Sequence, residues 1–288
     1  MAIKFKSLTY LYDEGMPYEH KALDNINLEL CEGKITAIIG ETGSGKSTLV
    51  EHLNALLLPS GGSLEILDRE IVPGKKKNKG LKSLRKQVGL VFQFSEYQLF
   101  EETILKDVAF GPKNYGINEN EATQKAIAAL NLVGIDQSMF NDSPLDVSGG
   151  QKRRIAIAGI LALEPEIIVL DEPTAGLDPK GAKEMIDLFV AINKKFGKTI
   201  IIVTHDNEMV YNYADNTVLM SKGNVIYSGS TLDLFNNDEL IKEYNLLEPR
   251  LVSFKRQLKE NGFKVGDEIR TIDELAAYIK KEIRRWTI

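Results

Sequence analysis

The sequence predicts an α/β protein with a buried, largely parallel sheet that carries polar residues at one edge. Three observations support this class. The glycine-rich stretch Gly40–Thr48 lies between an apolar, β-branched run at 35–39 and a segment with helical spacing. The apolar runs 167–170 and 199–204 have the composition of strands buried on both faces. A helical pattern over about residues 180–196 separates these two runs.

The composition limits the kind of protein that the chain can form. Its 288 residues, 43% of them hydrophobic, suffice for one large domain or one domain with an appendage. The formal net charge of -5 argues against nucleic acid as a bulk electrostatic partner. Cys31 is the only cysteine, which excludes an intrachain disulfide and fits a reducing compartment. The N-terminus lacks a signal peptide and no apolar run approaches the ~18 residues that span a bilayer, so we expect a soluble protein.

The glycine-rich stretch has the context that a phosphate-binding loop requires, because a strand precedes it and helical spacing follows at 49–57. Its glycines allow tight turns and a close approach of the main chain to an anion. Lys46 would reach the β- and γ-phosphates of a nucleotide, and the Ser47 hydroxyl would bind Mg²⁺. The alternative is a glycine turn with a chance Lys-Ser pair. The predicted phosphate-binding residues are Gly40, Glu41, Thr42, Gly43, Ser44, Gly45, Lys46, Ser47 and Thr48.

Short strands are predicted on both sides of this loop. Residues 3–10 and 22–30 form two of them, and 63–71 has the pattern of a β-hairpin. Tyr12, upstream of the loop, is the preferred candidate to stack on adenine through its π-face; the alternative is ordinary packing within a strand. Gln93 follows another strand, and its meaning depends on the motifs downstream.

A helical insertion is predicted from about residue 103 to 140, where apolar residues share one helix face. Those residues are Ala122, Ala126, Ile127, Leu130 and Val133. A further helix follows Ser148, a good N-cap, and the glycines Gly149 and Gly150 leave backbone N–H groups uncovered at its start. The stretch that ends at Gln151 therefore predicts a second anion-binding helix N-terminus, unless it is an ordinary capped helix start.

Two adjacent carboxylates follow the apolar run at 167–170. Such carboxylates at the end of a buried strand are costly unless a cation or a partner accompanies them. Asp171 is the expected outer-sphere Mg²⁺ ligand, and Glu172 would act as a general base toward water; the alternative is a solvated acidic turn. His205 follows the 199–204 strand at the edge where ligands of open α/β sheets bind. In this company it is a candidate for sensing the γ-phosphate, although alone it would be a structural histidine.

Beyond about residue 231 the chain is predicted to be helical. One helix is expected over 251–261, and a capping box at residues 271–274 starts another. That second helix carries Leu275, Ile279 and Ile283 on one side. The tail either packs on the chain's own core or makes a dimer contact, and the composition does not decide between the two.

These motifs, in this order, resemble those of the ATP-binding-cassette (ABC) ATPases over about residues 3–235. The resemblance identifies Walker A at Gly40–Ser47, the Q-loop glutamine at Gln93, the signature sequence at Ser148-Gly149-Gly150-Gln151, Walker B with its catalytic glutamate at Asp171-Glu172, the D-loop at Ala175–Asp178 and the switch histidine at His205. Val147 stands where the commonest signature has leucine. All six motifs together make the resemblance specific.

The finer resemblance is to the ATPase subunits of energy-coupling factor (ECF) transporters, which import vitamins and metal ions into prokaryotes. It lies in residues 93–103, in 151–159 and in the tail after about residue 235. The first of these stretches is closer to the second ATPase of the pair (A-prime) than to the first. The resemblance implies a P-loop NTPase (RecA-like) core with an N-terminal antiparallel β subdomain.

The same resemblance implies a division of the chain and a set of partners. Residues 1–235 would be the nucleotide-binding domain, with a helical subdomain at about 94–165, and residues 236–288 a C-terminal helical extension. ATP and Mg²⁺ would bind together, and Ser47 and Gln93 would be ligands of the metal. Lys46, Glu172 and His205 would be the catalytic groups. The partners would be a paralogous ECF ATPase in a heterodimer, a transmembrane T coupling subunit and an exchangeable S substrate-binding subunit, and no nucleic acid. The expected location is the cytoplasmic face of a prokaryotic cell membrane, as a peripheral protein.

Two alternatives stay open. One is the ATPase of an ordinary importer, which forms a homodimer. The other is a soluble cassette ATPase that works on ribosomes or DNA; such chains commonly carry two cassettes or a long coiled-coil insertion, whereas this chain has one cassette and no heptad stretch.

Overall fold

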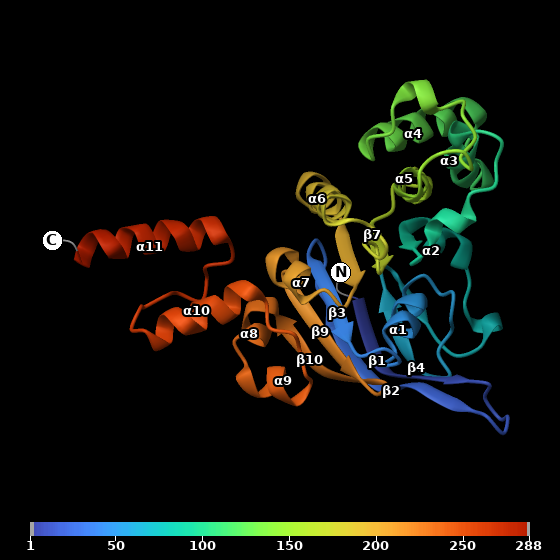
Figure 1. Cartoon of the computed structure of the whole chain (residues 1–288). Coiled ribbons are helices and arrows are strands. Elements are labelled where there is room, and N and C mark those ends of the chain that lie inside the picture. The colour runs from blue at the N-terminus through green and yellow to red at the C-terminus, as the bar shows by residue number, and fades with distance from the viewer. Residues whose placement is uncertain (1–2, 287–288) are drawn as a thin grey trace.

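The computed structural model describes the backbone of residues 3–286 and side chains as far as residue 282, and this part of the chain contains two β-sheets (Figure 1). The first is antiparallel, with strands in the order β2-β1-β4-β5. Its strands are β1 (Ile3–Tyr12), β2 (His20–Leu30), β4 (Gly61–Ile66) and β5 (Arg69–Ile71). They confirm the two N-terminal strands and the hairpin that the sequence predicts.

The second sheet has the order β10-β9-β3-β8-β7-β6 in the described chain. Every neighbouring pair runs parallel except β9 and β10, which form an antiparallel hairpin. Its strands are β3 (Ile35–Gly40), β6 (Val88–Val91), β7 (Ile167–Asp171), β8 (Thr199–Val203), β9 (Asn216–Ser221) and β10 (Asn224–Ser230). The predicted α/β class with buried parallel strands is therefore confirmed.

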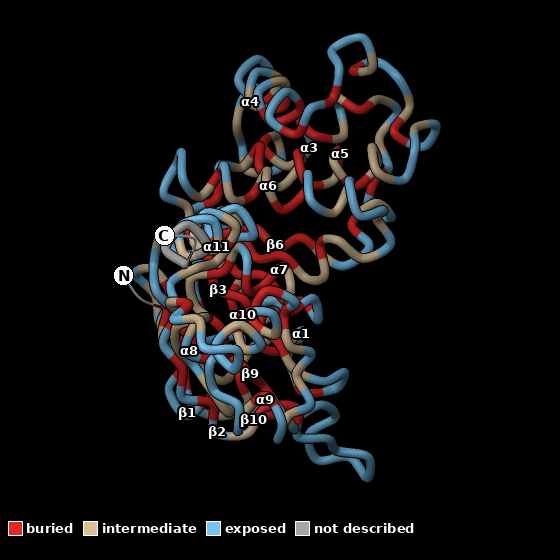
Figure 2. The backbone as a smooth tube through the Cα atoms, turned by 60° about the vertical axis from the view of Figure 1, so that its left-hand side comes forward, coloured by how far each residue is buried: buried red, intermediate tan, exposed pale blue. Residues whose placement is uncertain are grey.

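The parallel sheet is buried on both faces, as Figure 2 shows for the strands at the centre of the molecule. Successive side chains of a strand point to opposite faces. Ile38 and Val169 pack toward the antiparallel sheet and α1 (Lys46–Leu53). Ile39 and Leu170 pack toward the helices on the other side. Two cores separated by one sheet thus hold the carboxyl ends of β3, β7 and β8 in a fixed relation.

Helix α1 is shorter than the sequence pattern, which continues its helical spacing to residue 57. The helix ends at Leu53. The Asn54 side chain accepts a hydrogen bond from the backbone N–H of Leu56 at 3.1 Å, and Ala55 adopts a left-handed φ of 52°. This local bond competes with the helical one and turns the chain.

The predicted insertion forms α3 (Ile104–Asn114) and α4 (Glu119–Leu132), and the further predicted helix, α5 (Gly149–Leu161), completes a lobe with them at the upper right of Figure 1. Of the predicted apolar face, all members are buried except Ile127, which is half-buried. Thr103 and Asn118 cap α3 and α4 by accepting hydrogen bonds from backbone N–H groups. The lobe places the start of α5 at the surface, away from β3.

The remaining helices cover the sheet or continue the chain beyond it. They are α2 (Leu81–Gln87), α6 (Pro179–Phe196), α7 (Asn207–Tyr213), α8 (Thr231–Phe235), α9 (Asp238–Glu243), α10 (Arg250–Glu260) and α11 (Ile272–Trp286), with short 3₁₀ turns at Lys75–Lys77, Ser95–Gln98 and Gln137–Met139. None of the helices in the described residues combines the length and apolar character needed to cross a bilayer.

Part of the tail packs on the chain's own core, as the first of the two alternatives predicts. Leu275 is 3% exposed and Ile279 is partly buried against the same cluster as α7 and α8, while the side chain of Ile283 lies outside the described residues. The predicted capping box is present, because the Thr271 hydroxyl accepts from the Glu274 N–H at 3.2 Å and the Glu274 carboxylate accepts from the Thr271 N–H at 3.1 Å.

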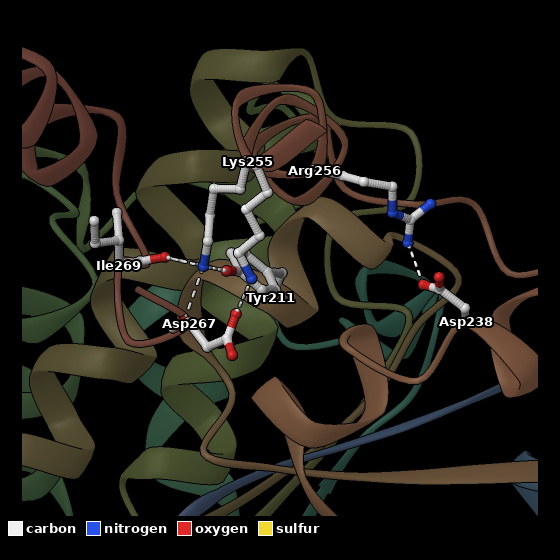
Figure 3. A network of polar contacts seen from close by, with 7 residues as sticks. Tyr211, Asp238, Lys255, Arg256, Asp267 and Ile269 are labelled. Atoms are coloured by element: carbon white, nitrogen blue, oxygen red, sulfur yellow. Dashed lines mark hydrogen bonds and ion pairs between the residues drawn. The ribbon is translucent and has the colours of Figure 1, made fainter. Parts of the chain in front are cut away.

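Polar contacts join this tail to α7 (Figure 3). The buried Lys255 ammonium of α10 donates to the carbonyl oxygens of Asp267 at 2.9 Å and Ile269 at 3.0 Å and lies 3.4 Å from the Tyr211 hydroxyl. Burial lowers the pKa of Lys255. Arg270 donates to the carbonyl oxygen of Tyr211 at 2.8 Å, and it also binds the Ala214 carbonyl. The tail therefore holds the end of the helix that begins directly after His205 and Asp206.

Candidate nucleotide-binding site

The loop between β3 and α1 depends on glycine at several positions. Gly40 and Gly45 have φ values of 144° and 99°, and a Cβ on either would come within 3 Å of a backbone oxygen. Gly43 also has a positive φ, 81°, but a Cβ there would meet nothing within 4 Å. Two glycines are thus required by the protein's own packing, and the third leaves open space beside the loop where an anion can approach the main chain.

The Lys46 side chain is held across this loop by backbone carbonyls of the loop. Its ammonium donates to the carbonyl oxygens of Gly40 at 2.8 Å and Glu41 at 2.7 Å. Burial lowers the pKa of Lys46, and the nearby carboxylates of Glu172 and Asp171 raise it in part. A half-buried cation whose acceptors are carbonyl oxygens gains from an incoming anion, so the arrangement suits a phosphate.

A cleft of about 530 Å³ lies beside the loop and collects most of the predicted site residues. Parallel strands end at one edge of the sheet, and the loops that follow β3, β6, β7 and β8 meet there. The lining residues that the sequence predicts are Tyr12, Thr42, Gly43, Gly45, Lys46, Ser47, Thr48, Gln93, Asp171, Glu172 and His205, and His20 joins them without having been predicted. Gly40, Glu41 and Ser44 form the loop without lining the cleft, and the Ser44 hydroxyl is buried with no hydrogen-bond partner.

Tyr12 lines the cleft and is 38% exposed. Its hydroxyl is 3.2 Å from the Thr48 hydroxyl, and its ring packs edge-on against Tyr10 with centroids 4.9 Å apart. A partly exposed aromatic ring that lines the cleft is suited to stacking on a base.

Glu172 and His205 form a hydrogen-bonded pair over the cleft. The Glu172 carboxylate accepts from His205 Nδ1 at 2.9 Å. The Glu172 side chain is 15% exposed, whereas the His205 ring is 80% exposed. Glu172 also has a left-handed backbone, φ 48°, pinned by its N–H donating to the Val203 carbonyl at 2.9 Å. Such strain in a non-glycine residue is typical of functional sites. Here the left-handed backbone turns the Glu172 side chain into the cleft instead of continuing the direction of β7.

The donor set beside the phosphate loop fits a hard divalent cation. Burial raises the pKa of Asp171, while a hydrogen bond from Ser47 and the Lys46 charge lower it. A half-buried carboxylate of this kind is stabilised by a cation. The Gln93 side chain adds an amide oxygen to the hydroxyl of Ser47, and oxygen ligands of these types are those that Mg²⁺ prefers.

The predicted signature residues lie elsewhere. Ser148 caps α5 in a reciprocal capping box with Gln151, whose side-chain oxygen accepts from the Ser148 N–H at 3.0 Å. A Cβ on Gly149 or Gly150 would meet nothing within 4 Å, so the start of the helix is uncovered. Asp178, predicted in the D-loop, caps α6 by accepting from the Gly181 N–H at 2.8 Å. None of these five residues lines the cleft of its own chain.

Sequence reasoning missed two buried side chains next to the site. Arg153 on α5 is 3% exposed and binds the loops after β6 and β7. His52 on α1 is fully buried; its Nδ1 donates to the Thr48 carbonyl at 2.7 Å, its Nε2 has no partner, and its ring packs edge-on against Tyr10. For His52 the signal in the sequence was a polar residue beside apolar ones on the predicted helix, whereas Arg153 stands in the polar run 151–154, which gave no sign of burial.

We expect His52 to make the stability of the fold depend on pH. Burial lowers the pKa of His52 to about 4, below its value of ~6.5 in an unfolded chain. Between these values the unfolded chain takes up a proton that the folded chain refuses, so the free energy of unfolding decreases as the pH falls. The part of the free energy of unfolding that depends on His52 should be fully present above pH 6.5. It should be about 2 kcal/mol smaller at pH 5 than at pH 7.

Urea unfolding of the wild type and of His52→Leu at both pH values measures this contribution. The variant should lose about 2 kcal/mol less than the wild type on going from pH 7 to pH 5. His20→Gln is the matched control because His20 is exposed, and it should behave as the wild type does. Equal pH dependence in the wild type and His52→Leu would show that His52 is accessible to protons in the folded state.

Comparisons with known proteins agree with the nucleotide-binding site described above. Residues 23–175 match the model of the ABC transporter family. The chain is 47% identical, over 284 residues, to the energy-coupling factor transporter ATP-binding protein EcfA2 of Enterococcus faecalis, covering 99% of this chain and 98% of that protein. It is 46% identical to the protein of the same name from Lactiplantibacillus plantarum, covering 98% of this chain and 96% of that protein.

Solved structures point the same way. The cbiO1 protein of Clostridium perfringens, described as part of the ABC transporter complex cbiONQ, is 39% identical with a TM-score of 0.73, covering 88% of this chain and 98% of that one. The cassette MJ0796, in a dimeric post-hydrolysis state with ADP and Pi, is 30% identical with a TM-score of 0.70, covering 80% and 98% of the two chains. This chain therefore belongs to the ABC transporter ATPases, in their energy-coupling factor branch.

Proposed function

We propose that this ECF-type ATPase hydrolyses ATP in a site that a second, paralogous ATPase chain completes. One observation carries the proposal: in the described residues the glycine-flanked helix starts at Lys46 and at Gly149 both suit a phosphate, and of the two only the first lines the cleft. Two chains placed head to tail would bring the signature helix of one to the phosphate loop of the other. Each chain would then supply one half of each of two nucleotide sites.

Within the cleft, we assign each predicted site residue a role in the reaction. Tyr12 stacks on adenine, the main chain of Gly43–Thr48 holds the phosphates, and Lys46 binds the β- and γ-phosphates. Glu172 takes the proton of the attacking water or orients it, and His205 holds the γ-phosphate. When bound, Mg²⁺ on Ser47 and Gln93, with Asp171 in its outer sphere, would neutralise charge on the phosphates. Positioning and charge stabilisation supply most of the catalysis.

ATP drives the movement because its affinity differs between two states of the pair of ATPase chains. It binds the closed pair of ATPase chains better than the open pair, because only the closed pair offers both helix starts to its phosphates. Hydrolysis removes that difference and lets the pair reopen. The cycle of closing and opening is the movement that the chain delivers to its membrane partners.

The segment after Gln93 is the surface we assign to the membrane partner. Phe94, Tyr97 and Phe100 are exposed there, Tyr97 to 84%, and Phe100 packs edge-on against Phe110 with ring centroids 4.9 Å apart. Clustered exposed aromatics mark interaction surfaces. They would contact a transmembrane T subunit, which with an exchangeable S subunit carries a vitamin or another micronutrient across the membrane. The chain would then sit on the cytoplasmic face of that membrane.

Purification of the tagged full-length chain from solubilised membranes of its own cell tests this assembly. We expect a paralogous ATPase, a hydrophobic T subunit and one or more small S subunits to be identified with it by mass spectrometry. Recovery of a symmetric pair of this chain would support the ordinary importer instead. Recovery of ribosomal or nucleic-acid partners would contradict transport altogether, and the net charge of -5 speaks against that result.

A further inference from the structure

We infer that Arg153 is a positioning residue that ties the signature helix to two loops of the same chain's ATP site. One of these loops carries Gln93, and the other directly follows Glu172. The inference deepens the proposed function and rests on it, since the roles of Gln93 and Glu172 in hydrolysis belong to that proposal.

The guanidinium of Arg153 is surrounded by acceptors from both loops. It donates to the Gln93 carbonyl at 2.7 Å and to the Pro173 carbonyl at 3.3 Å, and it also donates to the Ala175 carbonyl. Its Nε is 3.3 Å from the Glu96 carboxylate. A planar group with five donors in fixed directions can satisfy all of these acceptors at once, which the ammonium of a lysine cannot do.

Burial makes this cation dependent on its partners. The Arg153 side chain is 4% exposed and that of Glu96 is 20% exposed. A charge removed from water is stabilised only by good hydrogen-bond geometry, so the loops and the helix cannot separate cheaply. The carbonyl that accepts from Arg153 belongs to Gln93 itself, and Pro173 is adjacent to Glu172. The guanidinium therefore fixes the main chain at Gln93 and directly after Glu172, the residues proposed to bind the metal and to act as the base.

The same side chain connects two surfaces. At one end, α5 begins at the exposed Ser148, which would face the partner's ATP. At the other, Glu96 lies between the exposed Phe94 and Tyr97 in the segment assigned to the membrane partner. A shift of either surface would reach the loops of Gln93 and Glu172 through the hydrogen bonds and the ion pair of Arg153.

The neighbouring Arg154 provides a matched control on the same helix. It donates to the Val133 carbonyl at 3.1 Å and to the Glu184 carboxylate at 2.7 Å, and it contacts neither loop of the site. Both arginines form one ion pair and at least one bond to a carbonyl. They differ in what those bonds hold, so a comparison of the two separates a general effect of losing an arginine from an effect on the site.

The test measures ATP hydrolysis by the complete membrane complex with Arg153→Gln, Arg153→Lys or Arg154→Gln in this chain. A misplacement of catalytic groups should lower kcat by about 10- to 100-fold in Arg153→Gln, with KM for ATP changed less than about threefold. Arg153→Lys keeps the charge but not the fork, so it should recover little of the rate. Arg154→Gln should keep the kcat of the wild type.

Thermal unfolding and nucleotide-dependent association of the ATPase pair are recorded on the same samples. Arg153→Lys keeps the buried charge beside Glu96, so its thermal stability and its association should fall less than those of Arg153→Gln, and it serves if Arg153→Gln fails to fold. Glu96→Gln should lower kcat in the same direction, and combining it with Arg153→Gln should add less than the sum of the two effects. Equal kcat in the Arg153 and Arg154 variants, or full recovery by lysine, would overturn the inference. Failure of the proposed assembly shows instead in the identity of the co-purified partners, whatever the ratio between the variants.

Discussion

Glu172→Gln should nearly abolish ATP turnover while leaving ATP binding intact. The carboxylate is mostly buried, accepts a hydrogen bond from His205 and is set by a strained backbone at the end of β7. Glutamine has the same shape and keeps the hydrogen bond but has no base, so the loss of proton transfer should lower kcat by about 10²- to 10⁴-fold. Because ATP then stays bound, the variant should also accumulate the closed, ATP-dependent pair of ATPase chains.

Phosphate release and size-exclusion chromatography with and without ATP measure the two effects. Glu166→Gln is the matched control, since Glu166 directly precedes β7 and its carboxylate accepts from Gln87 at 3.0 Å, away from the cleft. That variant should hydrolyse ATP as the wild type does. Normal turnover in Glu172→Gln would remove Glu172 from the mechanism, and loss of turnover without any gain in the closed pair would contradict the role of hydrolysis in reopening.

Ser148→Arg should remove the nucleotide-dependent pairing of the chains. Ser148 lies at the exposed start of α5, where a Cβ on either following glycine would meet nothing. A long cationic side chain would fill the space intended for the partner's phosphates and lose the N-cap bond. We expect ATPase activity of the assembled complex to fall by about 10-fold or more, because positioning of the γ-phosphate is lost.

Asn118→Arg is the control for the loss of a helix cap in the same lobe. Asn118 caps α4 by accepting from the Glu121 N–H at 3.0 Å, so both substitutions should cost about 1 kcal/mol of stability. Only Ser148→Arg should change pairing and hydrolysis. An assembled complex that hydrolyses ATP normally with Ser148→Arg would contradict the model of facing signature helices.

Much of the fold could be predicted because local pattern and global packing agree. The strands β3, β6, β7 and β8 are largely apolar runs, and each of the motifs that follow them lies at the same edge in the structure. The phosphate loop is equally local, since its glycines, Lys46 and Ser47 are consecutive. The alternatives of a chance glycine turn at Lys46 and a solvated acidic turn at Asp171 are disfavoured by the cleft that both residues line.

Contacts between distant segments could not be predicted. The acceptors around Arg153 come from positions 93, 96, 173 and 175, and the sequence alone does not show that these positions meet. The orientation of Glu172 was also beyond the sequence, because it depends on a left-handed φ of 48° and on the bond from its N–H to the Val203 carbonyl of another strand. The roles of Ser148 and Asp178 toward a partner stay predictions, since within one chain both side chains cap helices.

The bonds between the C-terminal tail and α7 have a consequence for any shortened form of the chain. Arg270 and Lys255 supply donors to the carbonyls at the end of α7 and to the Tyr211 hydroxyl. A chain cut at residue 235 would lose these donors and uncover Phe235, whose ring packs edge-on against Tyr211. The tail thus stabilises α7, which begins two residues after His205. We expect the His205 side chain to be more mobile in a chain that ends at residue 235.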